Sequence, residues 1–191
     1  MKRYDLSKIP EWVSTQVSPR RLTHIRGVVK TAEKLALHYG LPVAKARTAA
    51  WLHDCAKELP KSEMAGWIRK ARKPLDGPEK QMPGLWHPHA GEGIAMSQWG
   101  IKDPSVLEAI RCHTLGHPRM KPLAQLIFIA DFVEPGRTFP GVALARKSAF
   151  ESLRKGVLAK ASMTIAFLFE KGMMIHPRLL ETWNSFCGGG A

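Results

Sequence analysis

Apolar residues recur at three- and four-residue steps along most of the chain, which is the period of amphipathic helices. The clearest stripe comprises Leu22, Ile25, Val28, Val29, Ala32, Leu35 and Ala36. Ser18 before this stripe is a favourable N-cap, and Pro19 suits the first helical position. Gly40 after the stripe is a natural helix stop. The pattern therefore predicts a helix from residue 19 to about residue 40.

The same period predicts eight further helices, at about residues 42–57, 61–72, 90–99, 104–113, 122–133, 142–153, 155–171 and 177–186. The stretch 73–88 contains four prolines and two glycines, so we expect a loop there. No segment alternates apolar and polar residues long enough to form a strand. We therefore expect an all-α fold, with a single domain over residues 1–187 and a disordered tail at 188–191.

Composition agrees with a globular chain. Hydrophobic residues make up 45% of the 191 residues, which suffices for a core and argues against disorder. No apolar run approaches the ~20 residues of a membrane helix, and no apolar signal segment follows the N-terminal charges. Three scattered cysteines, at positions 55, 112 and 187, exclude a disulfide framework. A cytoplasmic protein without a membrane segment is the expectation.

Charge points to anionic partners. The chain has 29 Lys and Arg residues against 16 Asp and Glu residues, a net charge of +13. Such a surface attracts nucleic acids, nucleotides or acidic membranes. The basic residues are spread along the chain, and no RNA-binding motif accompanies them. A basic module that contacts RNA or the ribosome is an alternative that rests on charge alone, and the sequence leaves a homodimer open.

Four polar residues occupy positions on or beside apolar helix faces. His53 falls within the alanine face of the helix expected at 42–57, and Asp54 follows it. Asp131 continues an apolar face, and His24 borders the first stripe. Each residue alone could be a satisfied core histidine or a member of an ion pair. An ionised carboxylate buried among apolar residues costs several kcal/mol unless it is paired or bound to a cation.

Together, these two imidazoles and two carboxylates predict a metal site. Their mixed nitrogen and oxygen donors suit Fe, Mn, Co or Zn with positions left open for water. His87 and His113 each stand next to a helix end, where they could bind a second metal or contact phosphate. A metal-stabilised structural protein is the non-enzymatic alternative.

The ordered set resembles the HD-domain metal-dependent phosphohydrolase superfamily, and nearly the whole chain resembles the YqeK-type HD-domain family. The matching segments are Arg21-Leu22-Thr23-His24, Leu52-His53-Asp54-Cys55-Ala56-Lys57, Leu85-Trp86-His87, Ala109-Ile110-Arg111-Cys112-His113-Thr114-Leu115-Gly116, Ile129-Ala130-Asp131-Phe132-Val133-Glu134-Pro135-Gly136-Arg137 and Ile175-His176-Pro177. One departure follows His87, where His89 and Glu92 replace small or apolar residues.

The resemblance implies symmetrical hydrolysis of diadenosine tetraphosphate to two ADP, with iron as the metal. It implies metal ligation by His24, His53, Asp54 and Asp131, and it makes His87 and His113 either ligands of a second metal or residues that face the phosphates. It implies catalytic roles for Asp54, Lys57, His87, His113 and Arg137. It implies substrate contacts for Arg21, Lys57, His87, His113, Thr114, Gly116, Asp131, Arg137 and His176.

The chain's own spacing gives partial support for two of these roles. Lys57 lies four residues after His53, so helical geometry would direct both side chains into one groove. Arg137 follows a Pro-Gly turn that can bring it back over the helix of Asp131. Other reactions of the superfamily, a nucleoside monophosphate phosphatase or a cyclic-nucleotide phosphodiesterase, would use the same metal residues and stay open as alternatives.

Overall fold

The computed structural model describes residues 4–72 and 74–187, and this part of the chain contains helices and no strand. The α-helices are α1 (Ile9–Gln16), α2 (Pro19–His38), α3 (Val43–Leu52), α4 (Lys61–Ala71), α5 (Gly77–Gln81), α6 (His87–Ser97), α7 (Pro104–Cys112), α8 (Pro122–Val133), α9 (Val142–Glu151), α10 (Leu153–Glu170) and α11 (Pro177–Cys187). The predicted all-α class is confirmed. The tail expected at 188–191 lies outside the described residues. None of the described helices is long and apolar enough to cross a membrane.

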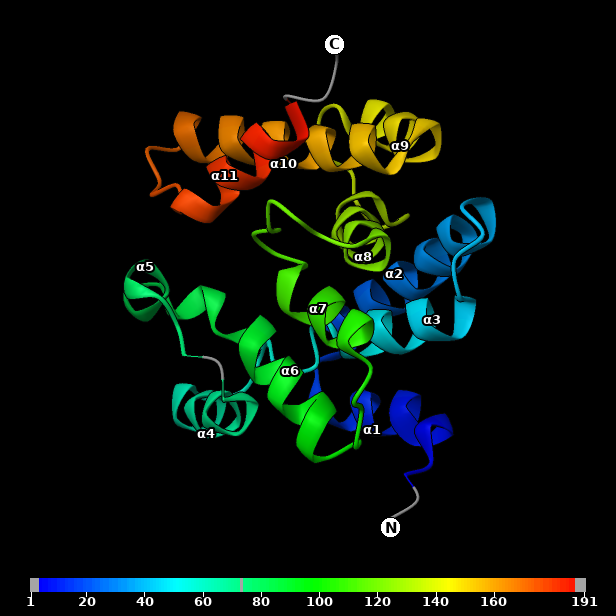
Figure 1. Ribbon diagram of the computed structural model, residues 1–191, viewed down its shortest axis with the longest axis vertical. Helices are drawn as coiled ribbons and strands as arrows, with labels where there is room; N and C mark the ends of the chain where they lie inside the picture. The colour runs from blue at the N-terminus through cyan, green and yellow to red at the C-terminus, as the bar shows by residue number, and fades with distance from the viewer. Residues whose placement is uncertain (1–3, 73, 188–191) are drawn as a thin grey trace.

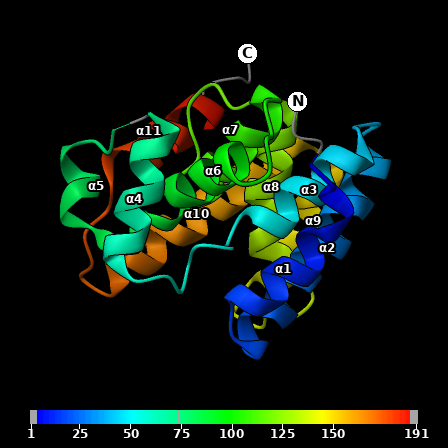
Figure 2. The same ribbon diagram turned by 90° about the horizontal axis from the view of Figure 1, so that it is seen from below.

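Helix α8 lies at the centre of the bundle (Figure 1). It contacts α2, α7 and α10, and residues 126–130 of α8 are fully buried. A helix covered on several sides needs apolar residues around most of its circumference, as this segment has. Helix α10 extends across the molecule from the side of α4 and α5 to α9 (Figure 2). Asp131, near the end of α8, therefore lies close to the middle of the fold.

The second predicted helix ends earlier than its sequence pattern indicates. Helix α3 stops at Leu52, and residues 53–58 form tight turns. The amides of Cys55, Lys57 and Leu59 donate to carbonyl oxygens three residues earlier, at 3.0–3.3 Å. The prediction of a helix to residue 57 is wrong. His53 and Asp54 consequently sit on a turn that points into the bundle.

The proline-rich stretch also differs from its prediction, because it is not wholly a loop. It contains α5 and a short 3₁₀ turn, and α6 begins at His87 rather than at about residue 90. Asp76 and Glu79 form a capping box on α5, in which each side chain accepts a hydrogen bond from the other residue's amide. Helix α1, which the pattern did not predict, buries Ile9 and Val13.

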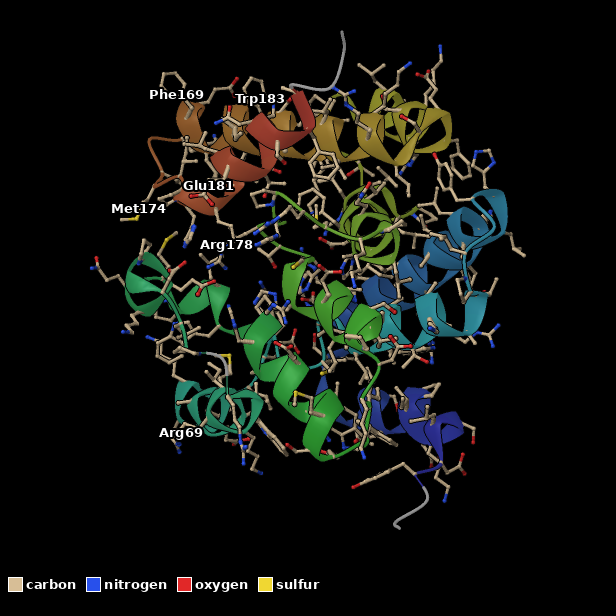
Figure 3. All side chains as sticks on the ribbon, in the orientation of Figure 1. Arg69, Phe169, Met174, Arg178, Glu181 and Trp183 are labelled. Atoms are coloured by element: carbon tan, nitrogen blue, oxygen red, sulfur yellow. The ribbon has the colours of Figure 1, made fainter. Side chains whose placement is uncertain are left out.

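Glu79 connects α5 to the C-terminal helix. Its Oε1 accepts hydrogen bonds from Arg178 Nη1 at 2.6 Å and from His89 Nε2 at 2.9 Å. Arg178 extends from α11 toward α5 (Figure 3) and also donates to Asp76. Burial alone would raise the pKa of Glu79, but the hydrogen bonds from His89 and the Asp76 amide and the charge of Arg178 lower it to about 2.

Replacing Glu79 with glutamine is expected to remove an acid-sensitive part of the stability. The folded-state pKa lies below the ordinary value of 4.5, so this carboxylate contributes stability above pH 4.5 that is lost as the pH falls toward 2. At neutral pH, the free energy of unfolding of the Glu79→Gln variant should be about 2 kcal/mol lower than that of the parent protein. Urea titrations at neutral and acidic pH measure the difference, which should shrink on acidification. The exposed Glu181→Gln change serves as the control, and a pH-independent difference would refute the assignment.

Candidate metal centre

Six predicted site residues meet beside the end of α8. They are His24 on α2, His53 and Asp54 on the turn after α3, His87 at the start of α6, His113 after α7 and Asp131 on α8. The ligand atoms of His24, His53 and Asp131 lie within 4.8 Å of one another. The ligand atoms of Asp54, His87 and His113 form a second such group.

Asp54 joins the two groups. Its Oδ2 lies 3.8 Å from Nε2 of both His24 and His53. Its Oδ1 lies 3.2 Å from Nε2 of His87 and 3.4 Å from Nε2 of His113. One carboxylate therefore faces all four imidazoles, which is the position of a bridging ligand if both groups hold a metal.

All four imidazoles are oriented in the same way. His53, His87 and His113 each use Nδ1 to contact the carbonyl oxygen three residues earlier, at 2.6, 2.9 and 2.8 Å. His24 uses Nδ1 to contact Glu134 Oε1 at 3.2 Å. With these acceptors holding a proton on Nδ1, the Nε2 of each ring would be free to ligate a metal beside Asp54.

The donor set fits a divalent transition metal. Nε2 of His24 and Nε2 of His53 are buried and have no hydrogen-bond partner among the described residues. Nε2 of His87 lies 3.0 Å from Nε2 of His113. Burial lowers the pKa of His53 to about 4 and that of His87 to about 3, so both rings are neutral at pH 7. Buried neutral nitrogens that converge on carboxylates are what a metal with mixed nitrogen and oxygen ligands requires.

Three predicted cations surround the centre. Arg21 Nη1 donates to Asp54 Oδ2 at 2.7 Å, and Arg137 Nη2 donates to Asp131 Oδ1 at 2.9 Å. The return of Arg137 over α8 agrees with the prediction from its turn. Lys57 Nζ lies 3.2 Å from Nε2 of His87, although the tight turn, rather than the predicted helical spacing, places it there.

Lys160 on α10 is a member of the site that the sequence analysis missed. Its buried Nζ donates to Asp131 Oδ2 at 2.9 Å and to the carbonyl oxygen of His113 at 2.7 Å. Burial by itself would raise the pKa of Asp131, but the charge of Lys160 holds that pKa well below its usual range. One feature of the sequence could have indicated Lys160: it shares a face of α10 with Val157 and Ala161, which are small or apolar and buried.

Glu134 is the second residue whose role the sequence did not reveal. Besides orienting His24, it accepts a hydrogen bond from the Gly136 amide at 2.6 Å. A Cβ on Gly27 would lie 2.4 Å from Glu134 Oε2, so a larger residue there would have to displace the carboxylate that holds His24. Carboxylates that hold a ligand histidine by its second nitrogen fix its orientation and tune metal affinity.

Of the remaining predicted residues, Thr114 and Gly116 lie beside the centre and His176 does not. Thr114 Oγ1 is 3.3 Å from His87 Nε2, and Thr114 and Gly116 line a pocket of about 300 Å³. Gly116 has a φ of +71°, and a Cβ there would lie 2.6 Å from Thr182. His176 is not brought to the centre, because its Nε2 lies 3.2 Å from Asp76 at the junction of α5 and α11.

Two residues that depart from the family pattern have structural partners. His89 is buried on α6 and contacts Glu79, and Glu92 is buried and pairs with Arg111. Arg111 and His89 also line the pocket of about 300 Å³. His89 and Arg111, the partner of Glu92, therefore belong to the wall of this pocket and not to the row of imidazoles.

Comparisons with known proteins agree with this geometry. Residues 21–136 match the model of the HD domain. The chain is 36% identical to the symmetrical bis(5'-nucleosyl)-tetraphosphatase of Bacillus subtilis, over 93% of this chain and 95% of that protein. It is 38% identical to the protein of the same name from Halalkalibacterium halodurans, over 93% of this chain and 94% of that protein. The chain belongs to the YqeK-type HD-domain family.

A solved structure also resembles this YqeK-type HD-domain protein. It is described as a predicted HD superfamily hydrolase involved in NAD metabolism from Clostridium acetobutylicum. The two chains superpose with a TM-score of 0.93 at 35% identity, over 99% of this chain and 100% of that one. Membership of the HD-domain family implies dependence on a divalent metal, in agreement with the converging imidazoles and carboxylates.

Proposed function

We propose that this HD-domain protein is a symmetrical bis(5'-nucleosyl)-tetraphosphatase that hydrolyses diadenosine tetraphosphate to two ADP. Relatives that carry this name match it over more than nine-tenths of both chains. The observation that carries the proposal is the convergence of four Nε2 atoms on Asp54 and Asp131, bordered by the cationic side chains of Arg21 and Arg137. No observation favours the monophosphatase, phosphodiesterase or RNA-binding alternatives over this one. The free cysteines suit the cytoplasm that we assign to it.

His24, His53, Asp54 and Asp131 would hold the catalytic metal, for which we propose iron, and His87 and His113 would hold a second ion with Asp54. When bound, such an ion supplies Lewis-acid activation of water and of a phosphoryl oxygen. Soft thiolate ligands are lacking in this set, and imidazole and carboxylate donors suit Fe²⁺ well.

The chain's cations are placed to bind the phosphates. Arg21 and Arg137 each donate to a carboxylate of the centre, and their planar guanidinium groups have further donors for phosphate oxygens. Lys57, beside His87, adds a third positive charge. Fixed cations around a transferring phosphoryl group stabilise the charge that develops on its oxygens.

We assign one nucleoside half of the substrate to the pocket next to Thr114. This pocket reaches about 300 Å³ and adjoins His87 through the Thr114 hydroxyl. A nucleoside held there by its base and by Gly116 would extend its phosphates toward the imidazoles. With two phosphates between the nucleoside and the centre, the central anhydride is the bond that is cleaved.

A substrate panel tests the proposed function. Metal-loaded protein, prepared with Fe²⁺ without oxygen, is given diadenosine tetraphosphate, AMP or cyclic AMP. We expect kcat/KM for the dinucleotide to exceed the others by about 100-fold or more, since only this substrate engages the pocket and all three cations. A preference for AMP or cyclic AMP would replace the proposal with one of the alternatives.

Arg137→Ala is expected to weaken catalysis while leaving the metal bound. Arg137 touches Asp131 but supplies no metal-ligating atom. Losing its contact with phosphate should lower kcat/KM by about 1–3 kcal/mol, or roughly 5- to 150-fold. Arg137→Lys restores charge but not a bidentate contact, and should recover only part of the loss. An Arg137→Ala variant with unchanged kcat/KM would exclude this role.

A further inference from the structure

A second and larger opening reaches the metal centre from the side of His24. This groove, which we call the α2 groove, has a volume of about 1000 Å³. Arg20, Arg26 and Lys30 of α2 line it, together with the Arg137 turn. Because helix positions three and four apart share a face, residues 20, 23, 24, 27 and 30 form a continuous wall that leads away from His24.

The α2 groove carries an excess of positive charge. Five Lys and Arg side chains line it, against the two carboxylates of Glu58 and Glu134. Both carboxylates already have partners: Glu58 accepts from the amide of Ser18 at 2.6 Å, and Glu134 holds His24. Arg20, Arg26 and Lys30 are exposed and form no ion pair within the described part of the chain. Three cations therefore face the groove without a protein counter-charge, as an anionic ligand would require.

The α2 groove and the pocket beside Thr114 meet the two ends of a row of imidazoles. The ring centroids of His24 and His53 are 5.6 Å apart, those of His53 and His113 4.9 Å, and those of His113 and His87 5.0 Å. His24 borders the groove, and His87 contacts Thr114 at the wall of the pocket. A ligand that spans this row would enter both openings.

We propose that the α2 groove binds the second nucleoside diphosphate half of the substrate, through phosphate contacts with Arg20, Arg26 and Lys30. This inference rests on the proposed dinucleotide hydrolysis and adds a second half-site to it. The volume of the groove lies at the upper end of the ~300–1,000 Å³ typical of ligand sites, so a nucleotide has room there. With two half-sites flanking the imidazoles, each product of symmetrical cleavage leaves from its own opening.

A triple variant tests the second half-site, R20Q/R26Q/K30Q. The control, K61Q/R69Q/K147Q, removes the same charge from exposed positions outside the groove, including Arg69 on α4 (Figure 3). Calorimetric titration of the metal-loaded protein with ADP should give two sites per chain in the parent and the control. The groove variant should retain one site, and its kcat/KM for diadenosine tetraphosphate should fall by about tenfold or more through KM.

The outcomes separate this inference from the proposed function. One ADP site in a parent protein that cleaves diadenosine tetraphosphate would overturn the second half-site and leave the function standing. Two sites and an unchanged kcat/KM in the groove variant would also overturn it. A parent protein that binds two ADP molecules but cleaves no dinucleotide would contradict the function and retain the groove as a nucleotide site.

Discussion

Asp54→Ala is expected to abolish metal binding and turnover together. The Asp54 carboxylate faces Nε2 of all four imidazoles at 3.2–3.8 Å, so its removal takes a donor from both ligand groups. Loss of a ligand from a site with few protein donors reduces affinity far more than loss of a supporting hydrogen bond. Elemental analysis of protein purified without oxygen, followed by a turnover assay on the same sample, measures both effects.

Two further variants sharpen this test. Asp54→Asn keeps the shape of the side chain but removes its charge, and it should lose metal and turnover as Asp54→Ala does. His176→Gln should keep the full metal content, because His176 contacts Asp76 away from the centre. An Asp54→Ala protein with undiminished metal would show that the ligand set is wrong.

Lys160→Met is expected to destabilise the metal-free protein by about 1.5–3 kcal/mol. The variant loses one buried partner of Asp131, while Arg137 still pairs with the other carboxylate oxygen, so the loss is smaller than that of a wholly unpaired buried charge. Here the methionine would withdraw the ammonium group from Asp131 Oδ2 and from the His113 carbonyl. Urea unfolding of metal-free protein measures the loss, with Lys155→Met, which changes an exposed lysine on the same helix, as the control.

A bound divalent ion should restore part of this stability, since it supplies positive charge next to Asp131 and binds only the folded state. The stability gap between Lys160→Met and the parent should therefore be smaller with metal than without it. A gap that does not respond to metal would mean that Asp131 is not a ligand. A Lys160→Met protein as stable as the Lys155→Met control would mean that the buried pair contributes nothing.

Helices with strong local signals were predictable from the sequence. Ser18 caps α2 by accepting from the Arg21 amide, and α8 has the predicted limits, Pro122–Val133. In both cases a proline fixes the first turn and an apolar period sets the length. The end of α3 was not predictable, because no Gly or Pro occurs between Pro42 and Pro60. In the turn at residues 53–58, His53 and Asp54 contact segments that are distant in the sequence. The hydrophobic periodicity of the sequence carries no information about such contacts.

The candidate site shows the same division. His53, Asp54 and Asp131 could be found because polar groups on apolar faces conflict with local burial. Glu134 and Lys160 could not be assigned, because their partners, His24 and Asp131, lie on other helices. The helical reasoning for Lys57 was wrong even though its predicted position beside the site was right. Sequence patterns therefore identified residues with a burial conflict and missed those whose role depends on tertiary contacts.

The identity of the first products tests the central claim most directly. Metal-loaded protein is mixed with diadenosine tetraphosphate, and the products of the earliest turnovers are separated by chromatography. A centre that meets the substrate two phosphates from each nucleoside predicts ADP as the sole nucleotide product. Equal amounts of AMP and ATP, or an absence of cleavage by fully metal-loaded protein, would contradict the account.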